Sequence, residues 1–266
     1  MNLKLQGKRS IVLASSSGLG YASARQLAEE GADVIVCSRD ESRSSEAVER
    51  IHTEVNVRSD QKVLYSQVDV SDADSVSALF DFAQAQLGGL DLLVCNAGGP
   101  PPGSFEKHDD SAWHQAFELT LMSVVRSVRA ARPLLRESDS AAVVVIGSSS
   151  VKRPIPNLLM SNVFRPAVHA LVNDISADLA GEGIRINMVS PGRIHTARVD
   201  QLDAAKAERE GKSADEVRQA SLKAMPLGRL GTPEEFANTV VYLLSDAASY
   251  VTGDSILVDG GMVRAL

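Results

Sequence analysis

A turn of small residues stands near the start of the chain, with the sequence ASSSGLG at residues 14–20. It follows a short apolar run and leads directly into a segment of helical period. Small side chains let backbone amides come close to a phosphate, and the first turn of a helix offers N–H groups and a dipole that favour an anion. Gly18 and Gly20 are weak evidence alone, but at a first strand-to-helix turn they indicate a site for a nucleotide pyrophosphate.

Ser38 and Arg39 stand at the end of the second apolar run, where the type of dinucleotide is decided. An acidic side chain at this point would hold a free ribose 2′-hydroxyl, whereas a basic side chain would accept a 2′-phosphate. The serine and arginine therefore predict NADP(H) rather than NAD(H). Asp40, one residue further on, keeps NAD(H) open as the alternative.

Short runs rich in β-branched residues alternate with longer segments of helical period. Because nearly every residue in each run is apolar, helices are expected to cover both faces of each strand. The alternation predicts an α/β fold with a parallel, doubly wound, seven-stranded sheet. The runs are residues 10–13, 33–37, 62–65, 90–95, 142–146, 184–189 and 255–258.

The segments between the strands are predicted to be helices. The last helix has the clearest start, with Thr232 as N-cap, Pro233 at the first position and Glu235 as the capping-box partner. No repeat or linker divides the 266 residues, so residues 1–266 are expected to form one domain. The other predicted helices cover residues 18–30, 40–55, 72–87, 110–136 and 157–181.

Residues 198–224 are dense in charge and lie between the sixth strand and the last helix. A long excursion at the carboxyl edge of a parallel sheet is a common place for a binding lid, so we expect a substrate lid here. A solvated helical hairpin without a role is the alternative. The proline-rich loop at residues 98–103 is expected to form a rigid, partly apolar rim of the same cleft.

Composition excludes several classes of protein. The net charge of −7 gives no basic surface for nucleic acid, so no such partner is expected. No run approaches the ~18 apolar residues of a membrane span, and the N-terminus lacks the pattern of a secretory signal. The two cysteines, Cys37 and Cys95, each end an apolar run and are expected to be buried reduced thiols, not metal ligands or a disulfide. We expect a cytoplasmic protein with no metal site and no membrane partner.

The motifs along the chain resemble those of the short-chain dehydrogenase/reductase family. The family's glycine motif is commonly TGxxxGxG; Leu13 and Ala14 stand in place of its threonine and first glycine, while Gly18 and Gly20 match. The resemblance implies a single-domain Rossmann-type fold with strand order 3-2-1-4-5-6-7. Further matches are Asp69, the NAG motif at Asn96-Ala97-Gly98, Pro191-Gly192, and Asp259-Gly260-Gly261.

The resemblance also implies roles for the matching residues. Asp69 would accept a hydrogen bond from the adenine amino group, with helix capping as its alternative. Asn96 and Gly98 would bracket the adenosine ribose, and Ile194 and Thr196 would meet the nicotinamide carboxamide. The full predicted cofactor set is Ser15, Ser17, Gly18, Leu19, Gly20, Ser38, Arg39, Asp69, Val70, Asn96, Ala97, Gly98, Arg165, Pro191, Gly192, Ile194 and Thr196.

The catalytic positions depart from the family pattern of Asn, Ser, Tyr and Lys. Ser148, which follows the fifth strand, matches the family serine. The tyrosine and lysine positions hold Ser161 and Arg165, and the asparagine position maps to Thr120. A phenol has a pKa near ~10 that a cation can lower, whereas an aliphatic hydroxyl is a much poorer acid and base. Arginine stays protonated in proteins, so it can bind an anion but cannot relay a proton.

A substitute proton donor is therefore needed if the chain is a reductase. His195 is the predicted candidate because it stands between Ile194 and Thr196 and imidazole titrates near neutrality. Lys152 and Arg153 follow Ser148 and would either assist Arg165 in binding an anion or point to solvent.

The sequence as a whole favours an NADP(H)-dependent oxidoreductase with an atypical active site, acting on an unknown small carbonyl or alcohol compound. Among relatives, 3-oxoacyl-carrier-protein reductases give the nearest general resemblance. The alternatives are a catalytically silent dinucleotide-binding sensor or scaffold, and a non-redox lyase or isomerase. A homotetramer or homodimer is expected, since family members associate through the helices predicted at residues 110–136 and 157–181.

Overall fold

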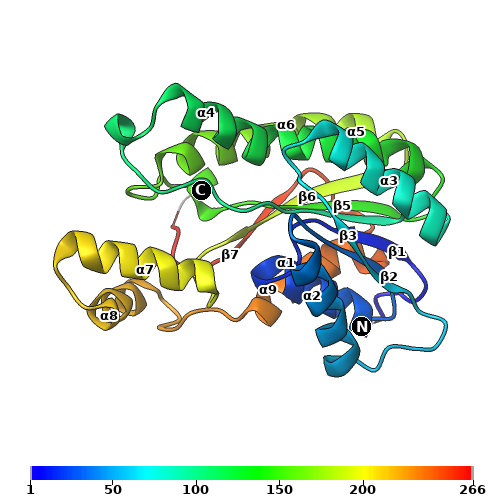
Figure 1. Ribbon diagram of the computed structural model, residues 1–266, viewed down its shortest axis with the longest axis horizontal. Helices are drawn as coiled ribbons and strands as arrows, with labels where there is room; N and C mark the ends of the chain where they lie inside the picture. The colour runs from blue at the N-terminus through cyan, green and yellow to red at the C-terminus, as the bar shows by residue number, and fades with distance from the viewer. Residues whose placement is uncertain (1, 265–266) are drawn as a thin grey trace.

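Seven parallel strands form one sheet in the order β3-β2-β1-β4-β5-β6-β7 within residues 2–264, which the computed structural model describes (Figure 1). The predicted fold class and strand order are confirmed. Each predicted strand is present, with ends that differ by a few residues at most. The bounds are β1 Arg9–Val12, β2 Asp33–Ser38, β3 Val63–Gln67, β4 Leu92–Cys95, β5 Ala141–Ile146, β6 Ile184–Pro191 and β7 Ser255–Val258.

Helices cover both faces of this sheet, which is why its strands are almost continuously apolar (Figure 1). One face packs against α1 (Gly18–Glu29), α2 (Glu41–Glu54) and α9 (Pro233–Leu244). The other packs against α3 (Ala73–Leu87), α5 (Ser123–Arg136) and α6 (Leu159–Ala180). Interior strands β4 and β5 are buried along their whole length, whereas every residue of edge strand β7 is partly exposed.

Side-chain caps begin several helices, and the capping box predicted at the start of α9 is confirmed. Thr232 caps α9, and Thr232 and Glu235 form a reciprocal capping box. Asp40 caps α2 and Asp72 caps α3 through their carboxylates. Short 3₁₀ turns connect other elements: η1 Phe105–Lys107, η3 Ser149–Val151 and η4 Asp246–Ala248.

The helix predicted over residues 110–136 is present with those bounds, but its path is interrupted by a π-helical turn that the sequence did not predict. It consists of α4 (Asp110–Phe117), a π-helical turn η2 (Glu118–Met122) and α5. Periodicity did not reveal the interruption because all three segments bury the same side. Thr120 lies at the centre of η2, and π turns inside helices often occur at functional sites.

Residues 198–224 fold as a helical hairpin, α7 (Ala197–Glu210) and α8 (Ala214–Ala224), joined at Gly211 with φ of 64°. The hairpin projects from the sheet at the end that also carries α4 (Figure 1). Buried Asp203 of α7 accepts two hydrogen bonds from Arg193, at 2.5 and 2.6 Å, which tie the hairpin to the loop after β6. Among residues 2–264, no helix is long and apolar enough to cross a membrane.

Candidate active site

A cleft of about 480 Å³ lies at the carboxyl ends of the strands. Its walls come from the loops after the strands β1 to β6 and from the starts of α6 and α7. Ligands of open parallel sheets bind at this edge because the loops and helix N-termini converge there. The cleft therefore has the position expected of the active site.

The turn between β1 and α1 presents backbone donors to this cleft. Ser17, the N-cap of α1, is extended and makes no side-chain cap bond, so the first amides of α1 are available to a ligand. Gly18 has φ of 60°, and a Cβ at this position would come 3.9 Å from the methyl group of Thr196 across the cleft. This turn fits the pyrophosphate of a dinucleotide.

Ser15 and Gly20 lie behind the turn and support it instead of lining the cleft. The buried Ser15 hydroxyl donates to the Val12 carbonyl at 2.5 Å and accepts from the Cys37 amide at 2.9 Å, which joins β1 to β2. A Cβ on Gly20 would lie 2.5 Å from the Ala14 carbonyl oxygen and 2.8 Å from Asn96 Nδ2. The structure therefore gives these two predicted cofactor residues a supporting position, not a lining one.

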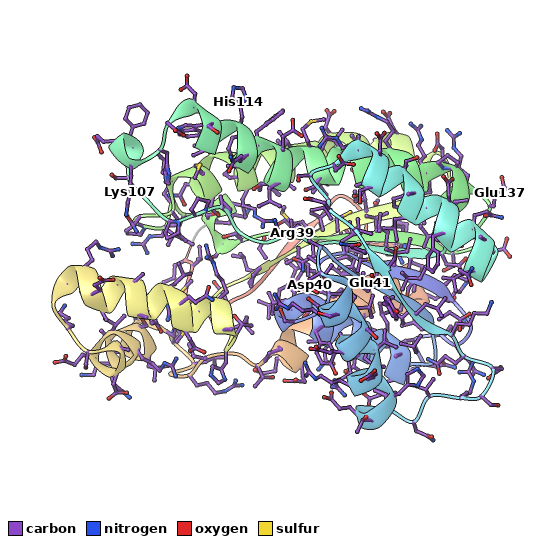
Figure 2. The ribbon with its side chains drawn as sticks, in the orientation of Figure 1. Arg39, Asp40, Glu41, Lys107, His114 and Glu137 are labelled. Atoms are coloured by element: carbon purple, nitrogen blue, oxygen red, sulfur yellow. The ribbon has the colours of Figure 1, made fainter. Side chains whose placement is uncertain are left out.

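The end of the cleft beside β2 is basic. Arg39 lines it, and so does Arg43 from the first turn of α2. The Asp40 carboxylate caps α2 by accepting from the Arg43 amide at 3.3 Å, and the Ser38 hydroxyl donates to the Asp40 carbonyl at 2.7 Å. Figure 2 shows Arg39 at the end of β2, beside Asp40 and Glu41. The carboxylate of Asp40, which was the alternative that favours NAD(H), is thus engaged in helix capping. The guanidinium groups of Arg39 and Arg43 are available for a 2′-phosphate.

At the end of the cleft where the resemblance expects adenine, Val68 and Val70 line the cleft and Asp69 does not. The Asp69 carboxylate accepts from the amide and hydroxyl of Ser71, at 2.9 and 2.6 Å. Burial opposes ionisation, but these hydrogen bonds hold the pKa of Asp69 below its ordinary value. Asp69 does not cap α3, because Asp72 does.

Ser148 and Ser161 line one region of the cleft. Ser148 follows β5, and its Oγ accepts the Ser150 amide at 3.1 Å. Because that bond uses an oxygen lone pair, the Ser148 hydroxyl proton can point to a ligand carbonyl. Ser161 lies in the first turn of α6, the position where the resemblance expects tyrosine.

Arg165 is a buried cation at the floor of this region. Its side chain is on the same helix as Ser161, and its Nη1 donates to the Ile146 carbonyl at 2.6 Å. Burial lowers the pKa of Arg165 to about 10, so the group remains protonated at neutral pH. A buried guanidinium in a cleft is suited to stabilise negative charge on a ligand oxygen.

Thr120 lies behind Arg165 in a separate small cavity of about 10 Å³, which both residues line. The Thr120 hydroxyl is buried and has no hydrogen-bond partner among residues 2–264. A cavity of roughly 10–15 Å³ is the smallest that holds one water molecule. Thr120 is therefore beside the guanidinium but does not reach the main cleft.

The predicted nicotinamide end is formed by the loop after β6. Pro191, Gly192, Ile194 and Thr196 line the cleft as the resemblance implies. His195 is exposed and is not among the lining residues, so the structure does not bring the predicted proton donor to the site. Lys152 and Arg153 are likewise exposed and lie outside the lining.

The lining contains no tyrosine and no lysine among residues 2–264. The cleft therefore holds hydroxyl groups and guanidinium groups where family members use a phenol and an ammonium. Of the predicted site residues, those that line it are Ser17, Gly18, Leu19, Ser38, Arg39, Val70, Asn96, Ala97, Gly98, Ser148, Ser161, Arg165, Pro191, Gly192, Ile194 and Thr196.

Two arginines of the lining were missed by the sequence reasoning. Arg43 could have been found because the first turn of a helix that follows a strand lies at the same sheet edge as the strand's end. Arg198 stood at the boundary of the predicted lid, and nothing in the sequence distinguished it from the lid's other charges. Its Nη2 donates to the Pro100 carbonyl at 3.0 Å, so α7 contacts the proline-rich loop.

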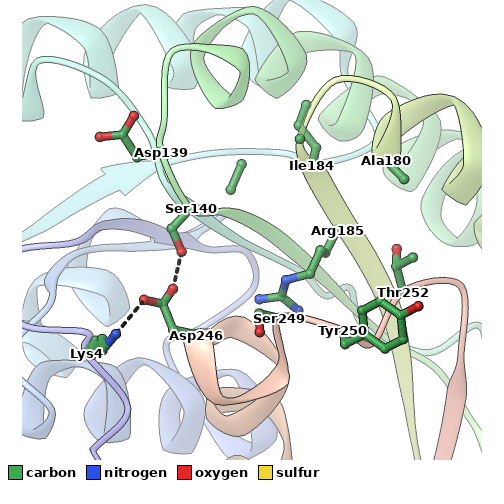
Figure 3. Close-up of a pocket in the computed structure, with 12 residues that line it drawn as sticks. Lys4, Asp139, Ser140, Ala180, Ile184, Arg185, Asp246, Ser249, Tyr250 and Thr252 are labelled. Carbon is green, nitrogen blue, oxygen red and sulfur yellow. Dashed lines mark hydrogen bonds and ion pairs between the residues drawn. The ribbon is translucent and has the colours of Figure 1, made fainter.

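A second hollow, of about 710 Å³, lies at the amino ends of β5 and β6 (Figure 3). Its most buried cation, Arg185, donates to the carbonyls of Leu243 and Ser245 at the end of α9, at 2.7 and 3.0 Å. Asp246 is paired with Lys4 and Ser140, as the dashed lines of Figure 3 show. These polar groups satisfy one another, which is typical of a structural junction.

Comparison with known proteins agrees with the cleft's geometry. The family model described as enoyl-(acyl carrier protein) reductase matches residues 13–263. The chain is 32% identical to the 3-oxoacyl-[acyl-carrier-protein] reductase of Staphylococcus aureus over 257 residues, which cover 96% of this chain and 98% of the relative.

Two solved structures are similar over nearly the whole chain. L-sorbose reductase of Gluconobacter frateurii, complexed with NADPH and L-sorbose, has a TM-score of 0.93 and 29% identity, with 100% of both chains covered. An NADPH-bound short chain oxidoreductase of Pseudomonas aeruginosa PAO1 has a TM-score of 0.87 and 30% identity, with 97% of this chain and 98% of that chain covered. The Pseudomonas enzyme contains an atypical catalytic center.

Proposed function

Because the chain belongs to the short-chain dehydrogenase/reductase family, we propose that it is an NADP(H)-dependent oxidoreductase of a small carbonyl or alcohol compound, with serine and arginine in place of tyrosine and lysine. The observation that carries the proposal is the cleft itself. It combines a phosphate-binding turn and a basic 2′-phosphate end with Ser148, Ser161 and Arg165 in one lining.

The residues of the cleft fit the cofactor. The open amides of α1 would hold the pyrophosphate, and Arg39 with Arg43 would hold the 2′-phosphate. Arg165 would reach the ribose next to the nicotinamide, in the position of the family lysine. When bound, the cofactor supplies a hydride to a carbonyl carbon, and a proton added to the carbonyl oxygen completes the alcohol.

The chain's own groups act on the carbonyl oxygen. The Ser148 hydroxyl, whose oxygen is fixed by the Ser150 amide, donates a hydrogen bond to it. The buried positive charge of Arg165 stabilises the negative charge that develops on the same oxygen. Neither Ser161 nor Arg165 is a good acid near neutrality, so the proton comes from solvent through the serine hydroxyls. Turnover should be slow compared with an enzyme that has a tuned phenol.

Two other functions use the same geometry. A silent dinucleotide-binding sensor or scaffold would need the phosphate end but not Ser148. A lyase or isomerase would need Ser148 and Arg165 but no change in the nicotinamide. Ser148 lines the cleft with its hydroxyl proton free to donate to a ligand, which favours an enzyme over a sensor.

The test is NADPH oxidation on a matched ketone panel by the native protein, by Ser148→Ala, and by the double variant Ser161→Tyr with Arg165→Lys. We expect slow native turnover that Ser148→Ala abolishes. The double variant should be faster, because it restores a tunable phenol, and Thr120→Asn is added as a third change to rebuild the buried polar position. Thermal melting shows whether each variant is folded. Native turnover that survives Ser148→Ala would contradict the proposed role of Ser148.

We also propose a cytoplasmic homo-oligomer. The cytoplasmic setting is supported by Cys37 and Cys95, which are unpaired and fully buried, as expected in a reducing compartment. The oligomer is supported by family membership and by Val163 on α6, an apolar side chain that is 44% exposed on a helix through which family members associate.

A further inference from the structure

The cleft has a one-sided charge. Its lining holds Arg39, Arg43, Arg165 and Arg198, and no aspartate or glutamate among residues 2–264. The chain as a whole carries a net charge of −7, so this concentration of positive charge is not a consequence of composition. The cleft is built for ligands that bring negative charge at more than one place.

Three of these arginines have a place in the proposed cofactor site, and the fourth does not. Arg39 and Arg43 stand at the 2′-phosphate end, Arg165 stands at the nicotinamide ribose, and the amides of α1 serve the pyrophosphate. Arg198 is in the first turn of α7, two residues after Thr196, at the end of the cleft assigned to the nicotinamide and the substrate.

The Arg198 side chain contacts the proline-rich loop and makes no ion pair with an acidic side chain of residues 2–264. Its Nη2 donates to the Pro100 carbonyl at 3.0 Å, and the space beside Gly99 is filled by the same guanidinium. Burial lowers the pKa of Arg198, and no acidic side chain of the described residues offsets that effect. The lining of the cleft also holds aliphatic side chains: Ile155, Leu158, and Val199 and Leu202 on the same helix as Arg198.

The Arg198 side chain is exposed at the mouth of the cleft and has no carboxylate partner among residues 2–264, so its charge is open to a ligand. A guanidinium binds carboxylate and phosphate oxygens in bidentate geometry. The hydrogen bond to Pro100 uses one of five N–H donors, which leaves others for such a group.

We propose that Arg198 binds an anionic group of the substrate, so that the substrate is an oxo or hydroxy compound that carries a carboxylate or a phosphate. The aliphatic residues of the lining pack against the carbon chain between the anion and the reacting carbonyl. This proposal rests on the proposed oxidoreductase function for the site but concerns recognition, which can be measured without turnover.

The first test measures binding alone. Dissociation constants of pentanoate and pentanamide are measured by NMR titration of the NADPH-loaded protein. We expect pentanoate to bind about tenfold to a hundredfold more tightly, as hydrogen bonds to a charged group allow. Arg198→Gln should remove that preference, Arg198→Lys should retain part of it, and Arg153→Gln, an exposed arginine outside the cleft, should leave it unchanged.

The second test measures turnover on matched pairs: 4-oxopentanoate with its methyl ester, and dihydroxyacetone phosphate with dihydroxyacetone. The native kcat/KM should favour the charged member of at least one pair by about tenfold or more, and Arg198→Gln should abolish that ratio. The pair with the larger ratio distinguishes carboxylate from phosphate.

The outcomes separate this proposal from the proposed function. A native protein that binds pentanoate in preference to pentanamide but oxidises no NADPH would support the anion site and contradict the reductase. Equal binding of the two probes, or a preference that survives Arg198→Gln, would overturn the anion site. A tenfold loss of NADPH affinity in Arg198→Gln with the preference intact would instead make Arg198 a cofactor ligand.

Discussion

Removal of Arg39 and Arg43 should change the choice of dinucleotide without harming the fold. Both side chains line the cleft and are exposed, and neither makes a side-chain hydrogen bond among residues 2–264. Their loss therefore leaves no buried partner unsatisfied. The variants are Arg39→Ala, Arg43→Ala and the double variant, with Arg153→Ala as a control that removes the same charge outside the cleft.

The expected magnitude follows from exposure. A hydrogen bond to a charged group contributes roughly 1.5–3 kcal/mol, and screening at an exposed site reduces this to about 1–1.5 kcal/mol for each arginine. Each single variant should therefore lose about tenfold in NADPH affinity, and the double variant about a hundredfold. NADH lacks the 2′-phosphate, so its affinity should change by less than about threefold.

Fluorescence titration of both nucleotides at two salt concentrations measures these effects. The native preference for NADPH should weaken as salt rises, whereas the double variant should show little dependence on salt. Equal affinity of the native protein for the two nucleotides would refute the reasoning. So would a preference for NADPH that persists in the double variant.

Three further predictions concern stability, the hairpin and assembly. Ala14 has φ of 48°, in the left-handed region, so Ala14→Gly should raise the free energy of unfolding by roughly 0.5–1 kcal/mol after the entropy cost of glycine, whereas Ala28→Gly within α1 should lower it. A urea titration in which Ala14→Gly lowers the free energy of unfolding would contradict this. Hydrogen exchange in α7 and α8 should slow when NADPH is added, because α7 begins in the cleft lining, and complete protection in the free protein would show a rigid insertion. Light scattering should find a dimer or tetramer at micromolar concentration, and a monomer would contradict the proposed oligomer.

Most of the fold could be predicted because the sheet and the helices on its two faces each have a recognisable pattern in the local sequence. The strands are buried on both faces and so read as continuous apolar runs, and the start of α9 carries a full set of capping residues. The interruption at η2 could not be predicted, since a π turn keeps the buried side of the helix and changes only the backbone path. The hairpin of α7 and α8 was recognised as a segment, but its attachment through Arg193 and Asp203 joins residues on different elements and has no local pattern.

The site was predictable where backbone motifs determine it. The turn at residues 14–20 and the loop after β6 follow directly from strand ends, so most predicted contacts of the cofactor lie in the cleft lining. Prediction failed where side-chain direction decides the outcome. His195 is next to two lining residues but points outward, and Arg198 reaches across to Pro100, which is distant in the sequence.

The central claim is that this cleft transfers a hydride between NADP(H) and a carbonyl carbon although it lacks the family tyrosine and lysine. Its most direct test is to supply NADPH deuterated at C4 of the nicotinamide, in each of the two stereochemical forms, together with 4-oxopentanoate and its methyl ester, and to analyse the products by mass spectrometry. We expect one of the two forms to give an alcohol that carries one deuterium at the former carbonyl carbon, and Ser148→Ala to give none. A product that forms without deuterium from either form, or a substrate that changes while NADPH is not consumed, would contradict the oxidoreductase and point to a lyase or isomerase.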